Sequence, residues 1–286
     1  MVGISATGLV GIGDNVVDAY LERGEYYPGG NALNVAVLAR RAGLVNTGYI
    51  GLIGNDAEGA HVRASMIAEG LSDGNLREAI GPNGKAEVTL DAQGDRVFLR
   101  SNKGGISRKL SLRMDADDLS LIERLGHVHT SCFSYLEGEL SRIRRLVRGL
   151  SFDFSTQRAP EYLAQVCPHV TMACFSAADL DDDGCIALIE QVRGFGVSTV
   201  AITRGVQDAL WMVDGTLFRQ SKKAADVVDT MGAGDAFIAA YLASSIQGAA
   251  PVVALDAAAT FAAKACGWFG AFGHPHPMDV DEEMLV

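Results

Sequence analysis

The sequence predicts an α/β protein with a central, mostly parallel sheet, helices on both faces of that sheet, and a small β appendage. Three observations lead to this prediction. The chain has 286 residues, 48% hydrophobic and 21% charged, which is enough for one large domain with a sizeable core. Apolar strand-like stretches alternate with stretches of helical spacing, which is the order that builds parallel sheets. Two hairpin-like segments interrupt that order in the first half of the chain.

The first half begins with "TGLVGIG" at 7–13, an apolar run that predicts a strand buried on both faces. A short hairpin is expected over 19–27, with its turn at Arg23-Gly24. Apolar residues at helical spacing predict a helix over 32–43 that ends at a glycine. A second buried strand, "TGYIGLIG", and a helix over 56–69 follow.

The second hairpin-like segment, "AEVTLDAQGDRVFLR" at 86–100, alternates about a Gln93-Gly94 turn. From about residue 115 strands and helices alternate again, and a hairpin is expected around Asp214-Gly215. The expected strands are 127–131, 150–154, 170–174 and 198–203, and the closing helices are 232–247 and 251–267.

Charge and cysteine content narrow the function classes. The chain carries 24 Lys and Arg against 35 Asp and Glu, a net charge of −11, so nucleic acid is not an expected partner. No apolar run reaches the roughly 20 residues that span a bilayer, so no membrane partner is expected either. The five cysteines lack C-x-x-C spacing, which favours reduced thiols and a cytoplasmic protein.

In open parallel sheets, ligands bind beyond the carboxyl ends of the strands, so polar groups that follow strands are the candidates for a site. They are Asp14, Asn15, Asp18, Asp153, Ser155, Thr203, Gly205 and the segment from Asp229 to Asp235.

The last of these segments reads "DTMGAGDAF". Gly232, Ala233 and Gly234 open a helix, and small residues let a ligand approach backbone N–H groups that have no partner inside the helix. The helix dipole should keep Asp235 ionised, so that it can accept a proton from an attacking hydroxyl. Anion donors beside a base are what phosphoryl transfer requires. The alternative is an ordinary helix start with a favourable acidic residue.

Two further loops have groups suited to a sugar. In "YYPGGNALN", Gly29 and Gly30 give access to the backbone, and Asn31 and Asn34 supply amide donors and acceptors; the alternative is a turn with a helix cap. In "GDNVVD", Asp14 and Asp18 could each accept hydroxyl hydrogen bonds; the alternative is an Asx turn.

These motifs resemble a known family. "DTMGAGDAFIAAYL" fits the C-terminal signature of the ribokinase-like (PfkB-type) carbohydrate kinases, and "GGNALNVA" fits the start of their N-terminal signature. The resemblance covers essentially the whole chain. Within the family the sequence is most similar to bacterial fructoselysine 6-kinases, on "IGDNVVDAY", "DRVF" and "FDFS" as well.

The resemblance implies a ribokinase-like fold, with a single domain over 1–286 and a β lid formed by about 18–28 and 85–101. It implies transfer of the γ-phosphoryl group of ATP, with Mg²⁺, to a primary hydroxyl of a small sugar or fructosamine, and a homodimer formed through the lid. A monovalent cation is a cofactor that the sequence leaves open.

The resemblance also implies residue roles. Asp235 would be the base, with Gly232, Ala233 and Gly234 as the anion hole. Substrate would be held by Asp14, Asp18, Gly29, Gly30 and Asn34, and the nucleotide by Thr203, Gly205, Thr230, Gly232 and Gly234.

The metal site departs from the family pattern. Relatives often have Asn-x-x-Glu after the strand that is expected at 170–174, where this chain has "SAAD"; Asp179 could hold a hydrated Mg²⁺ there. In the lid, Phe98 could stack on a sugar and Arg100 could meet a substrate carboxylate, or both could belong to a solvated strand end. His127 and His129 have too few further ligands nearby in sequence to indicate a metal.

Other functions stay open at this point. Within the family they are kinases of 2-keto-3-deoxygluconate, ribose, fructose or a nucleoside. Outside it they are a sugar- or nucleotide-binding protein without catalysis and, less favoured, a hydride-transfer enzyme.

Overall fold

The structure is a computed structural model that describes residues 7–90 and 96–278, without the side chains of residue 90 and residues 96–98. Its larger sheet has nine strands in the order β13-β12-β11-β10-β9-β8-β1-β4-β5. All neighbours are parallel except at β12 and β13, which pair antiparallel. The strands are β1 (Leu9–Gly13), β4 (Thr47–Gly54), β5 (Leu76–Ala79), β8 (His127–Ser131), β9 (Gly149–Asp153), β10 (Met172–Ser176), β11 (Thr199–Thr203), β12 (Ala209–Val213) and β13 (Thr216–Gln220).

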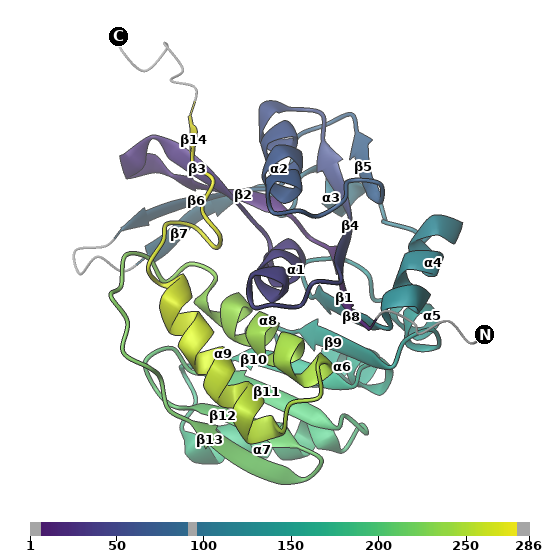
Figure 1. Cartoon of the computed structure of the whole chain (residues 1–286), viewed down its shortest axis with the longest axis vertical. Helices are drawn as coiled ribbons and strands as arrows, with labels where there is room; N and C mark the ends of the chain where they lie inside the picture. Colours follow the sequence, from purple (N-terminus) through teal and green to yellow (C-terminus); the bar gives the residue numbers. More distant parts are fainter. Residues whose placement is uncertain (1–6, 91–95, 279–286) are drawn as a thin grey trace.

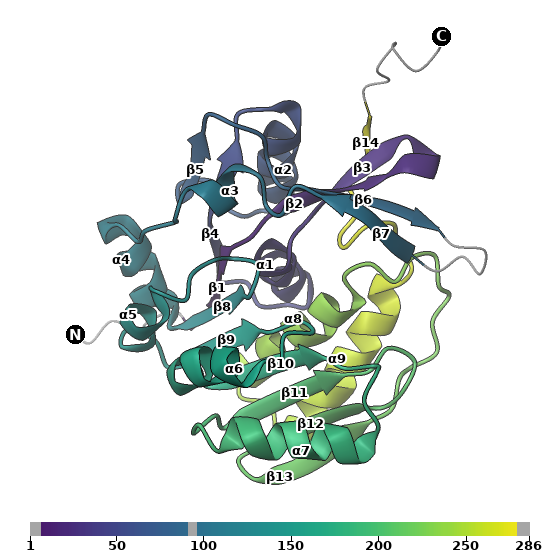
Figure 2. The same cartoon turned by 180° about the vertical axis from the view of Figure 1, so that it is seen from behind.

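Helices cover both faces of this sheet, which confirms the predicted fold class. Figure 1 shows one face, with α1, α8 and α9 in front of the strands, and Figure 2 shows the other, with α6 and α7 in front. Each face has its own apolar core. The helices are α1 (Asn31–Arg41), α2 (Ala57–Ala68), α3 (Ile106–Lys109), α4 (Ala116–Leu125), α5 (Leu140–Arg144), α6 (Pro160–Val166), α7 (Asp182–Arg193), α8 (Ala233–Ile246) and α9 (Pro251–Ala265).

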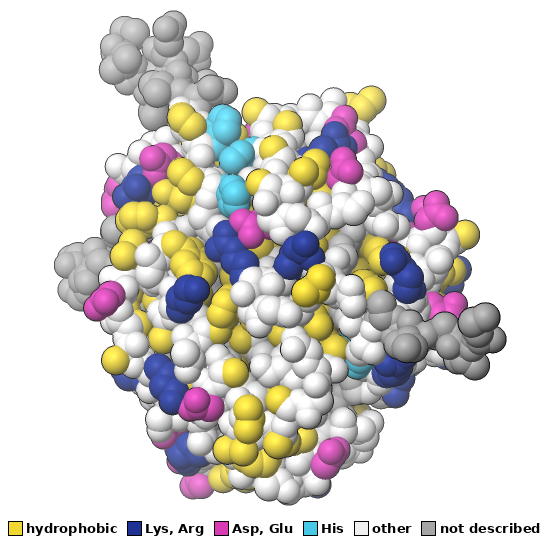
Figure 3. Space-filling view, viewed as in Figure 1, with side chains coloured by type: hydrophobic (Ala, Val, Ile, Leu, Met, Phe, Trp, Pro, Cys, Tyr) yellow, Lys and Arg dark blue, Asp and Glu magenta, His cyan; other side chains and the backbone are white. Residues whose placement is uncertain are grey.

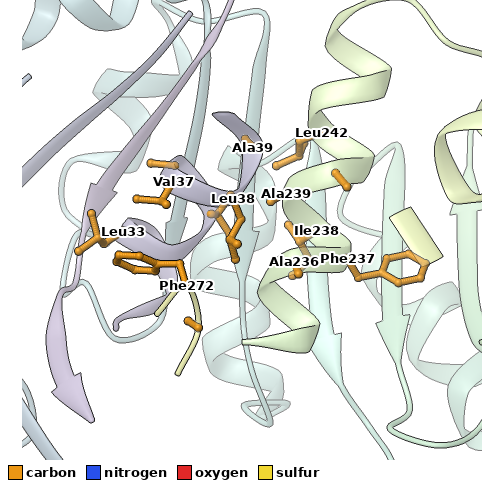
Figure 4. Packing of buried hydrophobic residues seen from close by; sticks show 14 of the residues in the cluster. Leu33, Val37, Leu38, Ala39, Ala236, Phe237, Ile238, Ala239, Leu242 and Phe272 are labelled. Atoms are coloured by element: carbon orange, nitrogen blue, oxygen red, sulfur yellow. The ribbon is translucent and has the colours of Figure 1, made fainter. Parts of the chain in front are cut away.

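The contact between α1 and α8 positions the site. Leu38 and Ala39 of α1 lie on the side that faces Ala239 and Leu242 of α8, in the buried core that Figure 4 shows. The alanines on α8 let the two helices approach closely, because little side-chain volume separates their backbones. The first turns of the two helices, which are far apart in sequence, are thereby brought side by side.

A second, smaller sheet projects from the domain (Figures 1 and 2). Its order is β14-β3-β2-β6-β7, and β2 pairs parallel with β6. Both expected hairpin segments contribute to it, and the tail adds a short strand that the sequence did not predict. The strands are β2 (Val16–Tyr20), β3 (Glu25–Gly29), β6 (Lys85–Leu90), β7 (Arg96–Ser101) and β14 (His276–Pro277).

Tyr20 and Tyr26 of the smaller sheet need no cover from a partner chain. Their exposures are only 5% and 4%, because the chain covers them itself. The Tyr20 hydroxyl donates to Asp229 Oδ2 at 2.6 Å, and the Tyr26 ring stacks on His276 with centroids 4.8 Å apart. Histidine side chains gather on the surface beside this part of the small sheet, below the grey C-terminal residues in Figure 3.

Among residues 7–90 and 96–278, no helix is both long and apolar enough to cross a membrane.

Candidate active site

Asp235 lies in the first turn of α8, and two amides from the first turn of α1 hold its carboxylate. Asn34 Nδ2 donates to Asp235 Oδ2 at 2.7 Å, and Asn31 Nδ2 donates to Asp235 Oδ1 at 2.8 Å. Both oxygens therefore have a fixed direction. The packing of α1 against α8 brings together two motifs that are about 200 residues apart in sequence.

The turn that leads into α8 requires glycine at 232. Gly232 has φ 71°, in the left-handed region, and a Cβ there would lie 2.6 Å from Ala271 Cβ. The Ala233 N–H donates back to Thr230 O at 3.2 Å, so this amide is part of the turn. The N–H groups of Gly234 and Asp235 come before the first helical partner of α8 and form the open end of the helix.

Asp14 follows β1 and is fixed by the protein. Its Oδ1 accepts hydrogen bonds from Ser131 Oγ at 2.7 Å, Ser134 Oγ at 2.8 Å and the Ala32 N–H at 3.3 Å. Because Ala32 lies in the first turn of α1, these bonds tie Asp14 to the helix that holds Asp235.

Asp18 lies on β2 beside the glycine pair on the neighbouring strand. A Cβ on Gly29 would come within 2.3 Å of Asp18 Oδ2, so position 29 can only be glycine while Asp18 keeps this rotamer. The next residue, Gly30, has φ 101° and lies against Asn15. The structure thus brings together Asp14, Asp18, Gly29, Gly30, Asn34 and Asp235.

The electrostatics of Asp235 differ from the sequence-based expectation. Burial raises the pKa of its carboxyl to about 6, against hydrogen bonds from Asn34 and Asn31 that favour the charged form. The negative charge of Asp14 raises this pKa further. Loss of hydration therefore outweighs the hydrogen bonds from the two amides and leaves the pKa of Asp235 above its ordinary value of 3.8.

Three further side chains belong to this network: Asn31 and Asp153, which the sequence marked as candidates without a link to Asp235, and His129, which it did not place in the site. Asn31 Nδ2 also donates to Asp153 Oδ2 at 2.8 Å, so one amide bridges two carboxyl groups. Burial, and next the charge of Asp235, raise the pKa of Asp153 to about 7. The ring of His129 lies 2.9 Å from Asn31 Oδ1 through its Nε2. The only sequence signal was position, since Asp153 and His129 belong to the adjacent strands β9 and β8.

Arg100, a candidate on β7, is not part of this cluster in the structure. Arg100 pairs with Glu87 at 2.8 Å and its side chain is 77% exposed. The side chain of Phe98 lies outside the described part of the chain.

The candidate metal ligand is already paired. Asp179 Oδ2 accepts from Arg158 at 2.8 Å, and this bond lowers the pKa of Asp179. Within the described residues, no group of three His, Cys, Asp or Glu side chains is arranged to hold a metal. Asp179 could serve a hydrated Mg²⁺ only as a single ligand that shares or releases Arg158.

The candidate nucleotide residues fall into two groups. Thr230, Gly232 and Gly234 lie at or just before the start of α8, and Thr203 and Gly205 lie at the carboxyl end of β11. Thr203 Oγ1 donates to Phe175 O at 3.3 Å, and Gly205 follows with φ 59°. A hollow of ≈ 450 Å³ adjoins the segment that leads to Asp229. It is lined by Lys223, Ala224, Ala225, Asp226, Thr260, Ala263, Lys264 and Gly267.

Comparison with known proteins identifies the family of the chain. The sequence matches the family described as pfkB family carbohydrate kinase over residues 2–141 and 155–274. It is 45% identical to the fructosamine kinase FrlD of Bacillus subtilis, over 96% of both chains. It is 27% identical to the fructoselysine 6-kinase of Escherichia coli, over 92% of this chain and 99% of that one.

Solved structures share the fold. An Arabidopsis thaliana ribokinase complexed with ribose and ATP superposes with a TM-score of 0.80 at 19% identity, covering 93% of this chain and 94% of that one. An E. coli putative ribokinase II in complex with ATP and Mg²⁺ gives 0.79 at 22% identity, with the same coverage. The chain therefore belongs to the pfkB family of carbohydrate kinases.

Proposed function

We propose that this kinase transfers the γ-phosphoryl group of ATP to a primary hydroxyl of a fructosamine, with fructoselysine and its 6-hydroxyl as the best candidates. The observation that carries the proposal is the carboxylate of Asp235, held by Asn31 and Asn34 at the open end of α8. The similarity to a fructosamine kinase and to fructoselysine 6-kinases supports the substrate class.

Each group around Asp235 has a task in this proposal. Asp235 accepts the proton of the attacking hydroxyl, and the two amides aim its oxygens. Asp14 and Asp18 accept hydrogen bonds from other sugar hydroxyls, and Gly29 and Gly30 let the sugar approach the backbone. The N–H groups at the start of α8 face the charge that develops on the transferred group.

ATP supplies the transferred group when it is bound, and the residues present suit it. The glycine-rich start of α8 is open to phosphate oxygens, because nothing lies within 4 Å of the place where a Cβ on Gly234 would be. Thr203, Gly205 and Thr230 would flank the phosphates. Mg²⁺ would be held largely by phosphate oxygens and water, because the carboxylate of Asp179 already pairs with Arg158. Activity in potassium and in sodium buffers would test for a monovalent cation.

Arg100 would have to exchange its partner in order to bind a substrate carboxylate. It now pairs with Glu87 on the surface of the smaller sheet. An exposed pair of this kind contributes little, so a substrate that enters beneath β7 could compete for the guanidinium. The same proposal makes the smaller sheet a lid over the sugar.

The test is ADP release over a panel of acceptors: fructoselysine, a fructosamine of a second amino acid, ribose, fructose, 2-keto-3-deoxygluconate and adenosine. The proposal predicts the highest kcat/KM for a fructosamine. A preference for ribose or adenosine would contradict the substrate class and leave the kinase class intact. Binding of fructosamine without ADP release would favour the non-catalytic alternative.

Assembly and location belong to the same proposal. We infer a homodimer formed through the smaller sheet, on which Leu21 and Leu99 remain exposed. We infer a cytoplasmic protein because all five cysteines are free thiols, which suits a reducing compartment.

A further inference from the structure

His129 and Asn31 form a buried hydrogen-bond chain that ends on the carboxylate of Asp235. The His129 ring is fully buried on β8 and touches polar partners at both nitrogens. Its Nδ1 lies 2.8 Å from Ser151 Oγ and its Nε2 lies 2.9 Å from Asn31 Oδ1. On its other side, the Asn31 amide nitrogen donates to Asp153 and to Asp235.

The chemistry of these groups leaves one consistent arrangement. Burial lowers the pKa of His129 to about 3, so the ring is neutral and carries one N–H. A carboxylate accepts hydrogen bonds, so Asn31 must turn its NH₂ group toward Asp153 and Asp235 and its carbonyl toward His129. The ring must then donate from Nε2 and accept the Ser151 hydroxyl proton at Nδ1, 2.8 Å away. The same hydroxyl lies 3.2 Å from Val128 O, and in this arrangement its single proton goes to the closer partner, the ring nitrogen.

The other tautomer of His129 would remove the hydrogen-bond donors from Asp153 and Asp235. If His129 carried its proton on Nδ1, its Nε2 would accept from Asn31, and the amide would turn over. Asn31 Oδ1 would then face two carboxyl groups that have lost their donor. A buried acceptor beside a negative charge is strongly unfavourable.

We propose that His129 is a positioning residue that acts through Asn31, fixing the amide so that its NH₂ group holds the carboxylate of Asp235 in place for proton transfer. Asp153 is the second acceptor that anchors the same amide. The inference rests on the proposed role of Asp235, although the hydrogen-bond chain can be measured without any turnover.

The experiment compares three variants of the full chain. His129→Leu removes the donor to Asn31. His129→Gln places an amide N–H near the position of Nε2 and keeps the donor. His127→Leu is the matched control, because it makes the same change at the start of the same strand, outside the hydrogen-bond chain.

The first readout is the titration of the Asp235 carboxyl by ¹³C NMR in the unliganded protein, with the signal assigned by its loss in Asp235→Asn. The expected midpoint in the parent chain is about 6. In His129→Leu the amide is free to turn over, so the midpoint should rise by about one pH unit. It should stay unchanged in His129→Gln and His127→Leu.

The second readout is kinetic. The acid limb of kcat/KM should move to higher pH in His129→Leu by the same amount, and kcat at pH 8 should fall about tenfold, with KM for ATP unchanged. An unmoved Asp235 midpoint in folded His129→Leu would overturn the proposal. So would an equal shift in His129→Gln.

If His129→Leu does not fold, the variant Asn31→Asp tests the next member of the hydrogen-bond chain, the amide of Asn31. This change keeps the side-chain shape and replaces the donors with a third carboxyl group. It should raise the Asp235 midpoint by more than His129→Leu would, and an unchanged midpoint would overturn the proposal. A parent chain without kinase activity would contradict the proposed function, whereas the NMR titration would still test the hydrogen-bond chain.

Discussion

Two opposite effects determine the pKa of the Asp235 carboxyl group. Burial favours the neutral acid, and the amides of Asn31 and Asn34 favour the carboxylate. The result, a pKa of about 6, suits a general base, because the group is charged at neutral pH and still basic enough to accept a proton.

This raised pKa makes folding stability depend on pH. Between the ordinary value of 3.8 and the folded value of about 6, the folded protein holds the Asp235 proton more tightly than the unfolded chain does. The contribution of Asp235 to stability is therefore full below pH 3.8 and is lost as the pH rises through 6.

The change in melting temperature that Asp235→Asn causes should therefore be several degrees more favourable at pH 8 than at pH 4. The reason is that the variant keeps a neutral group where the parent chain must bury a charge. Thermal melts of both proteins at the two pH values check this. An effect of equal size at pH 4 and pH 8 would contradict the raised pKa.

Asp18 should behave differently from Asp235 when it is replaced. It lies on β2 beside Gly29 and is proposed to bind hydroxyls, not to take the proton. Asp18→Ala should raise KM for the sugar more than it lowers kcat, if its bonds are equally strong in the ground and transition states. Steady-state kinetics with the preferred fructosamine measure this, and a loss mainly in kcat would contradict the assignment.

At the scale of elements, two glycines at the start of α8 have different roles: Gly232 is needed for the backbone conformation, and Gly234 leaves space for a ligand. Gly232 has a left-handed φ and no room for a Cβ, whereas Gly234 has open space where a Cβ would be. Gly232→Ala should lower the melting temperature markedly.

Gly234→Ala is the matched variant, and it should leave the melting temperature nearly unchanged while raising KM for ATP, because the added methyl group occupies space proposed for phosphate. Melting curves and ATP titrations of the two variants give the comparison. Normal ATP kinetics in Gly234→Ala would argue that phosphate binds elsewhere.

Strands and helices with strong local patterns could be predicted from the sequence. The apolar runs of β1, β4 and β11 and the spacing in α1 and α8 depend only on neighbouring residues. β5 was not predicted, because "LREA" alternates weakly and lies at the edge of the sheet. β14 is only two residues long and owes its existence to pairing with β3.

The site could be predicted only where it is built from local motifs. Asn34 and Asp235 belong to motifs that can be read in the sequence. The bridge from His129 through Asn31 to Asp153 joins three segments by long-range packing, and no local pattern encodes it. The raised pKa of Asp235 was missed for the same reason, because burial is a property of the folded chain.

At the scale of the whole molecule, the smaller sheet is the surface proposed for dimer formation. Its edge strand β7 and the exposed side chains of Leu21 and Leu99 are features that a partner could cover. One chain has a mass of 30.2 kDa, and light scattering at micromolar concentration should give twice that mass. Leu99→Lys should then shift the protein toward monomer, and a monomeric parent chain would contradict the dimer.

The most direct test of the account is the rate of phosphoryl transfer in Asp235→Asn with ATP and the preferred fructosamine at pH 8. The substitution keeps the shape of the side chain and removes its charge and its basicity. A positioned general base contributes about 10²–10⁴ in rate, so kcat should fall by at least about a hundredfold while KM for the sugar changes little. A folded Asp235→Asn variant with near-normal kcat would contradict the account.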